Sequence, residues 1–128
     1  MAPAIDFVKF MNLSFEQLFA AIDRKDADGF VAFLTDDAIF RYGSPPAIQG
    51  QENVRVYVAG FFQSIKALSH KVSAVYDSGD ALFYQGEVSY TLQDNRQISL
   101  PFLNLFKMRG GKITEYLVYI DPSPLMAE

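Results

Sequence analysis

The sequence predicts an α+β fold in which three N-terminal helices lie on the concave face of a curved antiparallel sheet. Hydrophobic residues recur at helical spacing as far as residue 65, and from residue 67 onward they alternate with a period of two. Turn-forming residues then divide the second half of the chain into four strands, at Asp77–Asp80, Asp94–Asn95 and Gly110–Gly111. Helices that precede an antiparallel meander are typical of this fold class.

Two short helices are predicted before the first strand. A capping box begins the first, because the Ser14 hydroxyl can accept a backbone N–H and the Gln17 side chain can reach back. Its apolar face is Phe15, Leu18, Phe19 and Ile22. Asp26 can cap the second helix. The expected buried side of that helix is Phe30, Phe33 and Leu34. Residues 6–12 fit a helix or an extended arm equally well.

The first strand and the third helix come next along the chain. The strand spans Ala38–Tyr42 and ends before Pro45–Pro46, because neither proline can donate a hydrogen bond to a sheet. Gly50 opens the helix, and Glu52 lies in its first turn, where the helix dipole favours a negative charge. The apolar positions at helical spacing are Val54, Tyr57, Val58, Phe61 and Ile65.

Four longer strands complete the predicted sheet. Their spans are Leu68–Asp77, Ala81–Gln93, Arg96–Met108 and Lys112–Asp121. Apolar residues occupy both faces of these strands, whereas an antiparallel sheet with one wet face should alternate with polar residues. Three helices cover only one face, so a homodimer through the outer sheet face is expected. The alternative is a crowded monomer core with some exposed tyrosines.

The composition indicates a single soluble domain and excludes several kinds of site. A chain of 128 residues is one domain (1–128) by length. It contains no Cys, which excludes disulfides and cysteine nucleophiles, and one His with scattered carboxylates gives no metal-ligand spacing. The net charge of −4 argues against nucleic acid as a partner. No apolar run approaches the roughly 20 residues of a membrane span, and no leader pattern is visible, so a cytoplasmic location without a membrane partner is expected.

Several short motifs resemble those of the nuclear transport factor 2-like superfamily, in its SnoaL-like branch. The matching segments are Asp26–Gly29, Asp36–Ala38, Gly50, Gly111–Ile113 and Tyr119–Pro122. The resemblance covers nearly the whole chain and implies a cone-shaped α+β fold with an internal pocket. It implies much less about chemistry, because that scaffold carries isomerases, hydrolases, cyclases, dehydratases and proteins without catalytic activity.

The catalytic positions that the resemblance implies hold different residue types in this chain. In ketosteroid-isomerase-like relatives a carboxylate base matches Tyr42, and the oxyanion donors match Leu18 and Leu103. A tyrosine is a poor base for a carbon-bound proton, and leucine cannot donate a hydrogen bond. In limonene-epoxide-hydrolase-like relatives an Arg and two Asp match Gln85, Glu87 and Val118, and the acidic residue of SnoaL-like cyclases also falls near Val118.

The same alignment defines a candidate pocket on the concave face. The residues expected to line it are Leu18, Tyr42, Phe61, Phe83, Gln85, Glu87, Ser89, Leu103, Tyr116 and Val118. Glu87 would be a carboxylate in an apolar cone, where desolvation raises a pKa, so it is the candidate general acid or base. The alternative is that Glu87 is paired with Arg41 or a Tyr hydroxyl, or faces the dimer.

Three further groups have both a functional and a structural interpretation. His70 can shuttle protons near neutral pH, with Val72, Ala74 and Tyr76 expected on its side of the strand, or it is simply hydrogen-bonded. Tyr42 and Tyr116 can donate to a ligand or give shape alone. The carboxylates of Asp36–Asp37 are expected in solvent, at a helix-to-strand turn.

Two functions from different classes follow from these residues. The first is cofactor-free acid–base chemistry on a small, largely apolar, oxygen-bearing molecule, with Glu87 as the acid or base and His70 or Tyr42 as its partner. The second is a binding or accessory module without catalysis, which the altered catalytic positions favour. A protein-interaction adaptor is a third and weaker interpretation. Neither the substrate nor the pathway is specified by the sequence.

Overall fold

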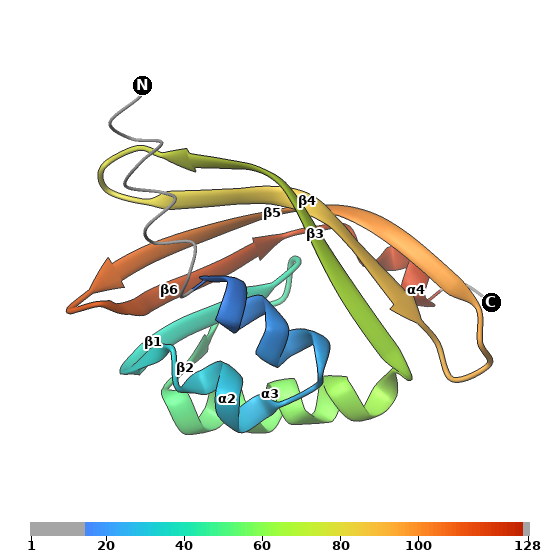
Figure 1. Cartoon of the computed structure of the whole chain (residues 1–128). Coiled ribbons are helices and arrows are strands. Elements are labelled where there is room, and N and C mark those ends of the chain that lie inside the picture. The colour runs from blue at the N-terminus through green and yellow to red at the C-terminus, as the bar shows by residue number, and fades with distance from the viewer. Residues whose placement is uncertain (1–14, 127–128) are drawn as a thin grey trace.

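The computed structural model describes residues 15–126, in which the helices lie beneath the concave face of a curved sheet (Figure 1). Residues 15–23 are helical, and the other helices are α2 (Ala27–Val31), α3 (Gln51–Ser64) and α4 (Ser123–Met126). The strands are β1 (Leu34–Tyr42), β2 (Ile48–Gln49), β3 (Ala67–Asp77), β4 (Leu82–Thr91), β5 (Gln97–Arg109) and β6 (Lys112–Tyr119). The predicted fold class is therefore confirmed. The segment 6–12 and the Ser14 cap lie outside the described residues.

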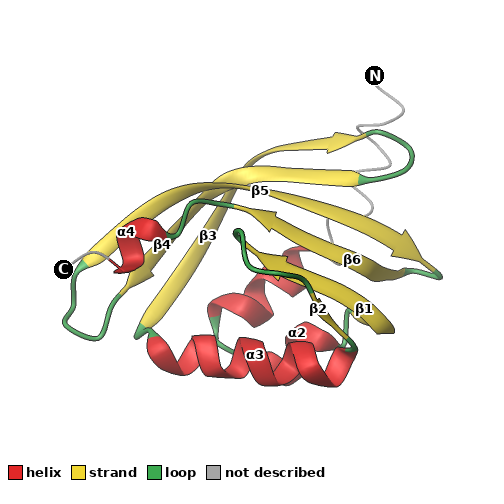
Figure 2. Cartoon of the chain, turned by 180° about the vertical axis from the view of Figure 1, so that it is seen from behind, coloured by secondary structure: helices red, strands yellow, loops and turns green. Residues whose placement is uncertain are grey.

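The six strands form one sheet in the order β2-β1-β6-β5-β4-β3. All neighbouring strands are antiparallel except β1 and β6, which run parallel, so the expectation of a wholly antiparallel sheet is wrong at this one pair. The strong curvature makes β3 and β4 bend over the helices, which Figure 2 shows from behind. The space between the curved sheet and the helices holds the core. Within the described residues, no helix is both long and apolar enough to cross a membrane.

The second helix is shorter and the first strand longer than the sequence predicts. Asp26 caps α2 as expected, its Oδ1 accepting the Gly29 N–H at 2.9 Å. The helix ends at Val31, because Phe33 and Leu34 are drawn into the sheet. The Phe33 carbonyl accepts the N–H of Ile113, and Leu34 pairs with Ile113 on β6. Contacts of Phe33 and Leu34 with the backbone of β6 thus take the place of a further helical turn.

A β-bulge in β3 decides which residues face the helices. Val72 pairs with Gly86 and Ala74 pairs with Gln85, so Ser73 is an extra residue in β3. His70 and Val72 lie on the concave side, whereas Ala74 and Tyr76 are displaced to the outer side. The prediction that these four residues share one face is therefore wrong, because the extra residue reverses the alternation.

The concave face of β4 and β5 carries the large apolar residues. Its buried members include Leu82, Tyr84, Val88, Tyr90, Leu100, Phe102 and Phe106. They pack against Phe15, Leu18 and Phe19 of the first helix and against Val54, Val58 and Phe62 of α3. Phe62 was not among the predicted apolar positions of that helix, and Tyr57, which was, is 39% exposed.

Candidate functional site

A cavity of about 60 Å³ lies between the concave face of the sheet and the helices. Side chains from all three covering helices and from β1, β3, β4, β5 and β6 line it. Most are apolar, and aromatic rings dominate; they include Phe30, Phe40, Phe61, Phe62, Phe102 and Tyr116. One water needs roughly 10–15 Å³ of such space, so this conformation has room for a few waters, and a larger ligand requires the walls to move.

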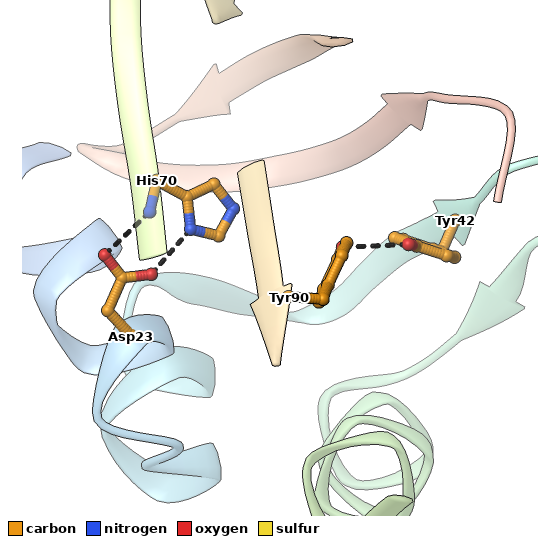
Figure 3. Close-up of polar contacts among 4 residues, drawn as sticks. All are labelled: Asp23, Tyr42, His70 and Tyr90. Carbon is orange, nitrogen blue, oxygen red and sulfur yellow. Dashed lines mark hydrogen bonds and ion pairs between the residues drawn. The ribbon is translucent and has the colours of Figure 1, made fainter. Parts of the chain in front are cut away.

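His70 and Asp23 form a hydrogen-bonded pair at one side of this cavity. Asp23 is the last residue of the first helix, and His70 lies in β3 and lines the cavity. The His70 Nδ1 lies 2.6 Å from Asp23 Oδ1, and the His70 backbone N–H donates to Asp23 Oδ2 at 3.0 Å (Figure 3). The two contacts fix the carboxylate on both oxygens. The aromatic rings of Phe19 and Phe102 flank the imidazole at 5.1 and 5.4 Å between centroids.

This geometry sets the chemistry of the imidazole. A carboxylate only accepts hydrogen bonds, so the Nδ1 of a neutral His70 carries the hydrogen. The Nε2 atom then carries the basic lone pair, and in Figure 3 it points away from Asp23. His70 is also the only histidine in the sequence. The pair is therefore a proton acceptor that an adjacent carboxylate orients and whose charged form that carboxylate stabilises.

A second polar contact crosses the cavity between the hydroxyl groups of Tyr42 and Tyr90, which lie 2.8 Å apart (Figure 3). Tyr42 is in β1 and Tyr90 in β4, two strands that are not neighbours in the sheet. The ring of Phe61 from α3 packs on both tyrosines, at 5.3 and 5.8 Å between centroids. Burial raises the pKa of Tyr42 and of Tyr90 above the ordinary value. Both phenols therefore remain protonated at neutral pH and act as hydrogen-bond donors or acceptors.

Asn104 is the one buried polar residue among residues 15–126, with 1% of its surface exposed. It lies in β5 between Tyr84 of β4 and Val118 of β6, and it lines the cavity. Its Oδ1 atom has no hydrogen-bond partner in the described part of the chain. An amide oxygen thus faces an apolar space without a donor.

The predicted pocket residues divide into two groups. Tyr42, Phe61, His70, Tyr116 and Val118 all line the cavity, which brings them together as the sequence predicts. Their roles in binding or catalysis stay predictions. Leu18 is completely buried in the core, packed with the neighbouring apolar side chains, and is not among the residues that line the cavity.

The other predicted pocket residues lie on the opposite face of the sheet. Glu87, Gln85 and Ser89 are exposed on the outer face of β4. Phe83 of β4 and Leu103 of β5 are half-buried on the same face of the sheet. Their placement inside the cone is wrong, because the predicted alignment was displaced by one residue in β4 and β5. A one-residue displacement moves every side chain of a strand to the other face. Glu87 is therefore no candidate for an acid or base within the cavity.

Three residues of the site escape prediction from the sequence: Asp23, Tyr90 and Asn104. Asp23 lies four residues after Phe19, at the edge of the apolar helix face, and this spacing is the signal that it points inward. Asn104 is the single polar residue in an alternating row whose other members are Leu100, Phe102 and Phe106. Tyr90 continues the alternating apolar positions of its strand, so its sequence gives no sign of a polar role, and its hydroxyl partner lies far away in the sequence.

The acidic pair Asp36–Asp37 is exposed, as expected, but it lies within β1 and not at a turn. The Asp37 carboxylate accepts hydrogen bonds from Arg109 and Thr35. The Arg109 guanidinium beside it lowers the pKa of Asp37. Within residues 15–126 no group of three His, Asp or Glu side chains is arranged to hold a metal ion.

Comparisons with known proteins agree on the fold. The model of the SnoaL-like domain matches residues 15–116. An NTF2-like protein of unknown function from Burkholderia pseudomallei superposes with a TM-score of 0.80 at 15% identity, over 91% of this chain and 94% of its own. A putative SnoaL-like polyketide cyclase from Jannaschia superposes with a TM-score of 0.78 at 19% identity, over 91% of this chain and 90% of its own.

A third similar structure is an LEH-like epoxide hydrolase from Mycobacterium tuberculosis. It superposes with a TM-score of 0.72 at 18% identity, over 88% of this chain and 83% of its own. No curated protein sequence matches the chain. At these identities the structural similarities establish the fold and nothing finer.

Proposed function

The chain belongs to the SnoaL-like domain family, and from this premise we propose that it binds a small, largely apolar, oxygen-bearing molecule and acts on it by acid–base chemistry. One observation carries the proposal. His70 lies in an apolar cavity with Nδ1 held by a carboxylate and Nε2 left for a ligand. The names of two similar structures, a putative polyketide cyclase and an epoxide hydrolase, associate small-molecule chemistry with this scaffold.

In the proposed mechanism the Nε2 atom of His70 takes a proton from the bound molecule. The electron pair left behind moves onto an oxygen of that molecule, which then accepts a hydrogen bond from a tyrosine hydroxyl. Asp23 stabilises the resulting imidazolium through the Nδ1 hydrogen. His70 returns the proton at another atom of the molecule or at the same oxygen. The aromatic walls exclude water, so the charge interactions are stronger than in solvent.

The described residues that line the cavity narrow the choice of proton-transferring group. They include no Asp, Glu, Lys or Arg, so the imidazole of His70 is the lining side chain best suited to accept a proton. Three of the lining tyrosines, Tyr42, Tyr90 and Tyr116, have pKa values raised by burial and are better donors than bases. The described lining residues therefore offer no carboxylate as a base. They offer the imidazole of His70, which the Asp23 carboxylate orients.

A second candidate function is ligand binding without turnover. It is favoured by the small size of the cavity, about 60 Å³, and by the presence of a single imidazole and no carboxylate among the described residues of its wall. A protein that only carries or senses a molecule needs shape and hydrogen bonds and no proton transfer. The two candidates share the ligand site and differ only in what His70 does there.

The experiment begins with a thermal-shift screen against steroid, terpenoid, polyketide-like and aromatic acid panels. A ligand at about 100 times its Kd should add about 2.7 kcal/mol of stability. Product formation from each hit is then followed by mass spectrometry in the wild type and in His70→Gln. Turnover that His70→Gln abolishes while binding persists supports the enzyme. Binding with no turnover in either protein supports the second candidate, and turnover that survives in His70→Gln contradicts the role of His70.

We also propose that a second copy of the chain covers the outer face of the sheet. Tyr76 and Tyr119 are 54% and 45% exposed there. The Arg41 guanidinium lies 5.3 Å from the centroid of the Tyr119 ring, and its buried Nε has no partner among the described residues. Half-buried apolar side chains extend this patch; they are Phe83, Leu103, Leu105 and Leu117. A large apolar patch on a twisted sheet is suited to an isologous contact.

A further inference from the structure

The cavity wall contains a hydrogen-bond acceptor that the protein itself does not use. Asn104 is 1% exposed, it lines the cavity, and its Oδ1 has no donor among residues 15–126. The flanking side chain on β6 is Val118, which has no polar atom to offer. An amide oxygen kept from water without a donor destabilises the folded protein by roughly 1–3 kcal/mol. A leucine would fill the same position without this penalty.

The two tyrosine hydroxyls are in a different situation. Tyr42 and Tyr90 lie 2.8 Å apart and satisfy each other, so they are stable in the free protein. The Nδ1 and backbone N–H of His70 are likewise satisfied by Asp23. The Oδ1 atom of Asn104 is thus the fully buried acceptor of the cavity that has no donor within the described chain.

We propose that the Oδ1 atom of Asn104 selects ligands that carry a hydroxyl donor, by accepting a hydrogen bond from that hydroxyl inside the cavity. This inference rests on the proposed function only in using the same cavity; it does not require His70 to transfer a proton. The aromatic wall favours a flat ring as the body of the ligand. A molecule of the same shape with a methyl group in place of the hydroxyl leaves the amide oxygen unpaired and is rejected.

Phenol and toluene are the probes for the test, because they differ only in a hydroxyl and a methyl group of similar size. Their Kd values are measured by NMR titration in the wild type, Asn104→Leu and His70→Gln. Asn53→Leu is the matched control, because the Asn53 side chain is exposed on α3 and donates to the Gln49 carbonyl, away from the cavity wall. The side-chain amide signals of the asparagines are followed in the same titration, and the signal of Asn104 is identified by its loss in Asn104→Leu.

The quantity compared is the ratio of phenol affinity to toluene affinity. We expect Asn104→Leu to lower this ratio about tenfold, since a lost hydrogen bond in a buried site is worth about 1–3 kcal/mol. Asn53→Leu should leave the ratio unchanged, and phenol should shift the Asn104 amide signal. In the absence of any probe, Asn104→Leu should also raise the thermal midpoint, because it removes the unpaired oxygen.

Several results would overturn the inference. A ratio that falls in His70→Gln and persists in Asn104→Leu would identify the imidazole as the acceptor. A ratio unaffected by either variant would show that no single acceptor selects the hydroxyl. Failure of both probes to bind at millimolar concentration, or a lower midpoint for Asn104→Leu, would also count against it. None of these outcomes depends on turnover, so they do not test the proposed proton transfer by His70, which the turnover measurement tests separately.

Discussion

The backbone of Lys71 approaches Gly86 so closely that a Cβ atom on Gly86 would lie 2.1 Å from the Lys71 carbonyl oxygen. The close approach lies directly beside the bulge at Ser73, where β3 bends toward β4. His70 lies just before the bulge, where β3 and β4 are in regular register and His70 pairs with Val88 on the concave side. The glycine on β4 therefore permits the close approach at which the alternation of β3 changes, directly after the segment that carries the imidazole.

Gly86→Ala is expected to destabilise the protein by about 1–3 kcal/mol, because the added methyl group meets backbone atoms that cannot rotate away. Gly60→Ala is the matched control: Gly60 lies in α3, and a Cβ atom added there would meet no atom within 4 Å. That change should stabilise the helix by up to about 1 kcal/mol. Urea unfolding measures both. Equal stabilities for Gly86→Ala and the wild type would show that the two strands are not so tightly apposed.

Asp23 should determine which nitrogen of His70 carries the hydrogen. In the wild type the neutral ring is expected to be protonated on Nδ1, because Asp23 accepts from that atom. Asp23→Ala should remove this preference and destabilise the fold by about 1–3 kcal/mol, since two hydrogen bonds to a carboxylate are lost. The ¹⁵N shifts of the single histidine report the tautomer directly. Glu16→Ala, an exposed change on the same helix, should alter neither quantity.

The buried tyrosines predict a loss of stability in alkali. Burial raises the pKa of Tyr42, Tyr90 and Tyr116 in the folded state above the unfolded value of about 10. Below about pH 10 both states hold the phenol proton, so these groups add no pH dependence there. Above it the unfolded chain releases protons that the folded chain retains, and the free energy of unfolding falls.

Urea unfolding between about pH 9 and pH 11.5 tests this dependence. Tyr116→Phe should make the decline shallower, because one buried phenol no longer contributes. Tyr76→Phe serves as the control, since Tyr76 is 54% exposed and its removal should leave the slope unchanged. A slope that is identical in all three proteins would contradict the raised pKa of Tyr116.

The hydrogen bond between Tyr42 and Tyr90 should contribute about 1 kcal/mol to stability. Tyr42→Phe and Tyr90→Phe each remove it, so each single change is expected to destabilise the protein by a similar amount. The double variant should be less destabilised than the sum, because the bond is lost only once. Urea unfolding of the four proteins forms the double-mutant cycle. Strict additivity would mean that the two hydroxyls do not depend on each other in solution.

The proposed contact between two copies is tested through their outer sheet faces. Leu103→Lys places a charge in the middle of the apolar patch and should convert a two-copy particle into a single copy. Val56→Lys is the matched control, because Val56 is 58% exposed on α3, on the other side of the molecule. Light scattering after gel filtration gives the mass of each. A single-copy wild type would contradict the proposal.

Prediction from the sequence succeeded where local signals were strong. The turns at Asp77–Asp80, Asp94–Asn95 and Gly110–Gly111 placed all four long strands to within about two residues. The direction in which side chains point failed in β4 and β5, because alternation repeats every two residues and an alignment from distant motifs is easily displaced by one. The extra residue of β3 has no local signature in the sequence, since it becomes visible only in the pairing of β3 with β4 and in the close approach at Gly86.

Only part of the candidate site was predicted, because the partners of its recognisable residues are distant in the sequence. His70 and Tyr42 were expected to be important because their chemistry is recognisable in the sequence alone. Their partners were missed, because Asp23 and Tyr90 are 47 and 48 residues away from them and become neighbours only through the curvature of the sheet. A hydrogen bond between distant residues is a property of the fold and leaves no periodic pattern.

The parallel pairing of β1 with β6 has a consequence for how the chain folds. Phe40 finds its long-strand partner only at Tyr116, after the whole β3–β5 meander has intervened. Contacts between such distant segments form slowly, because the entropy cost of closing a large loop comes before the contacts contribute any favourable free energy. The apolar side chains of the helices and of β1 are therefore expected to stay uncovered until β6 pairs with β1. During synthesis we expect this interval to be the one in which the uncovered apolar side chains are most exposed to aggregation.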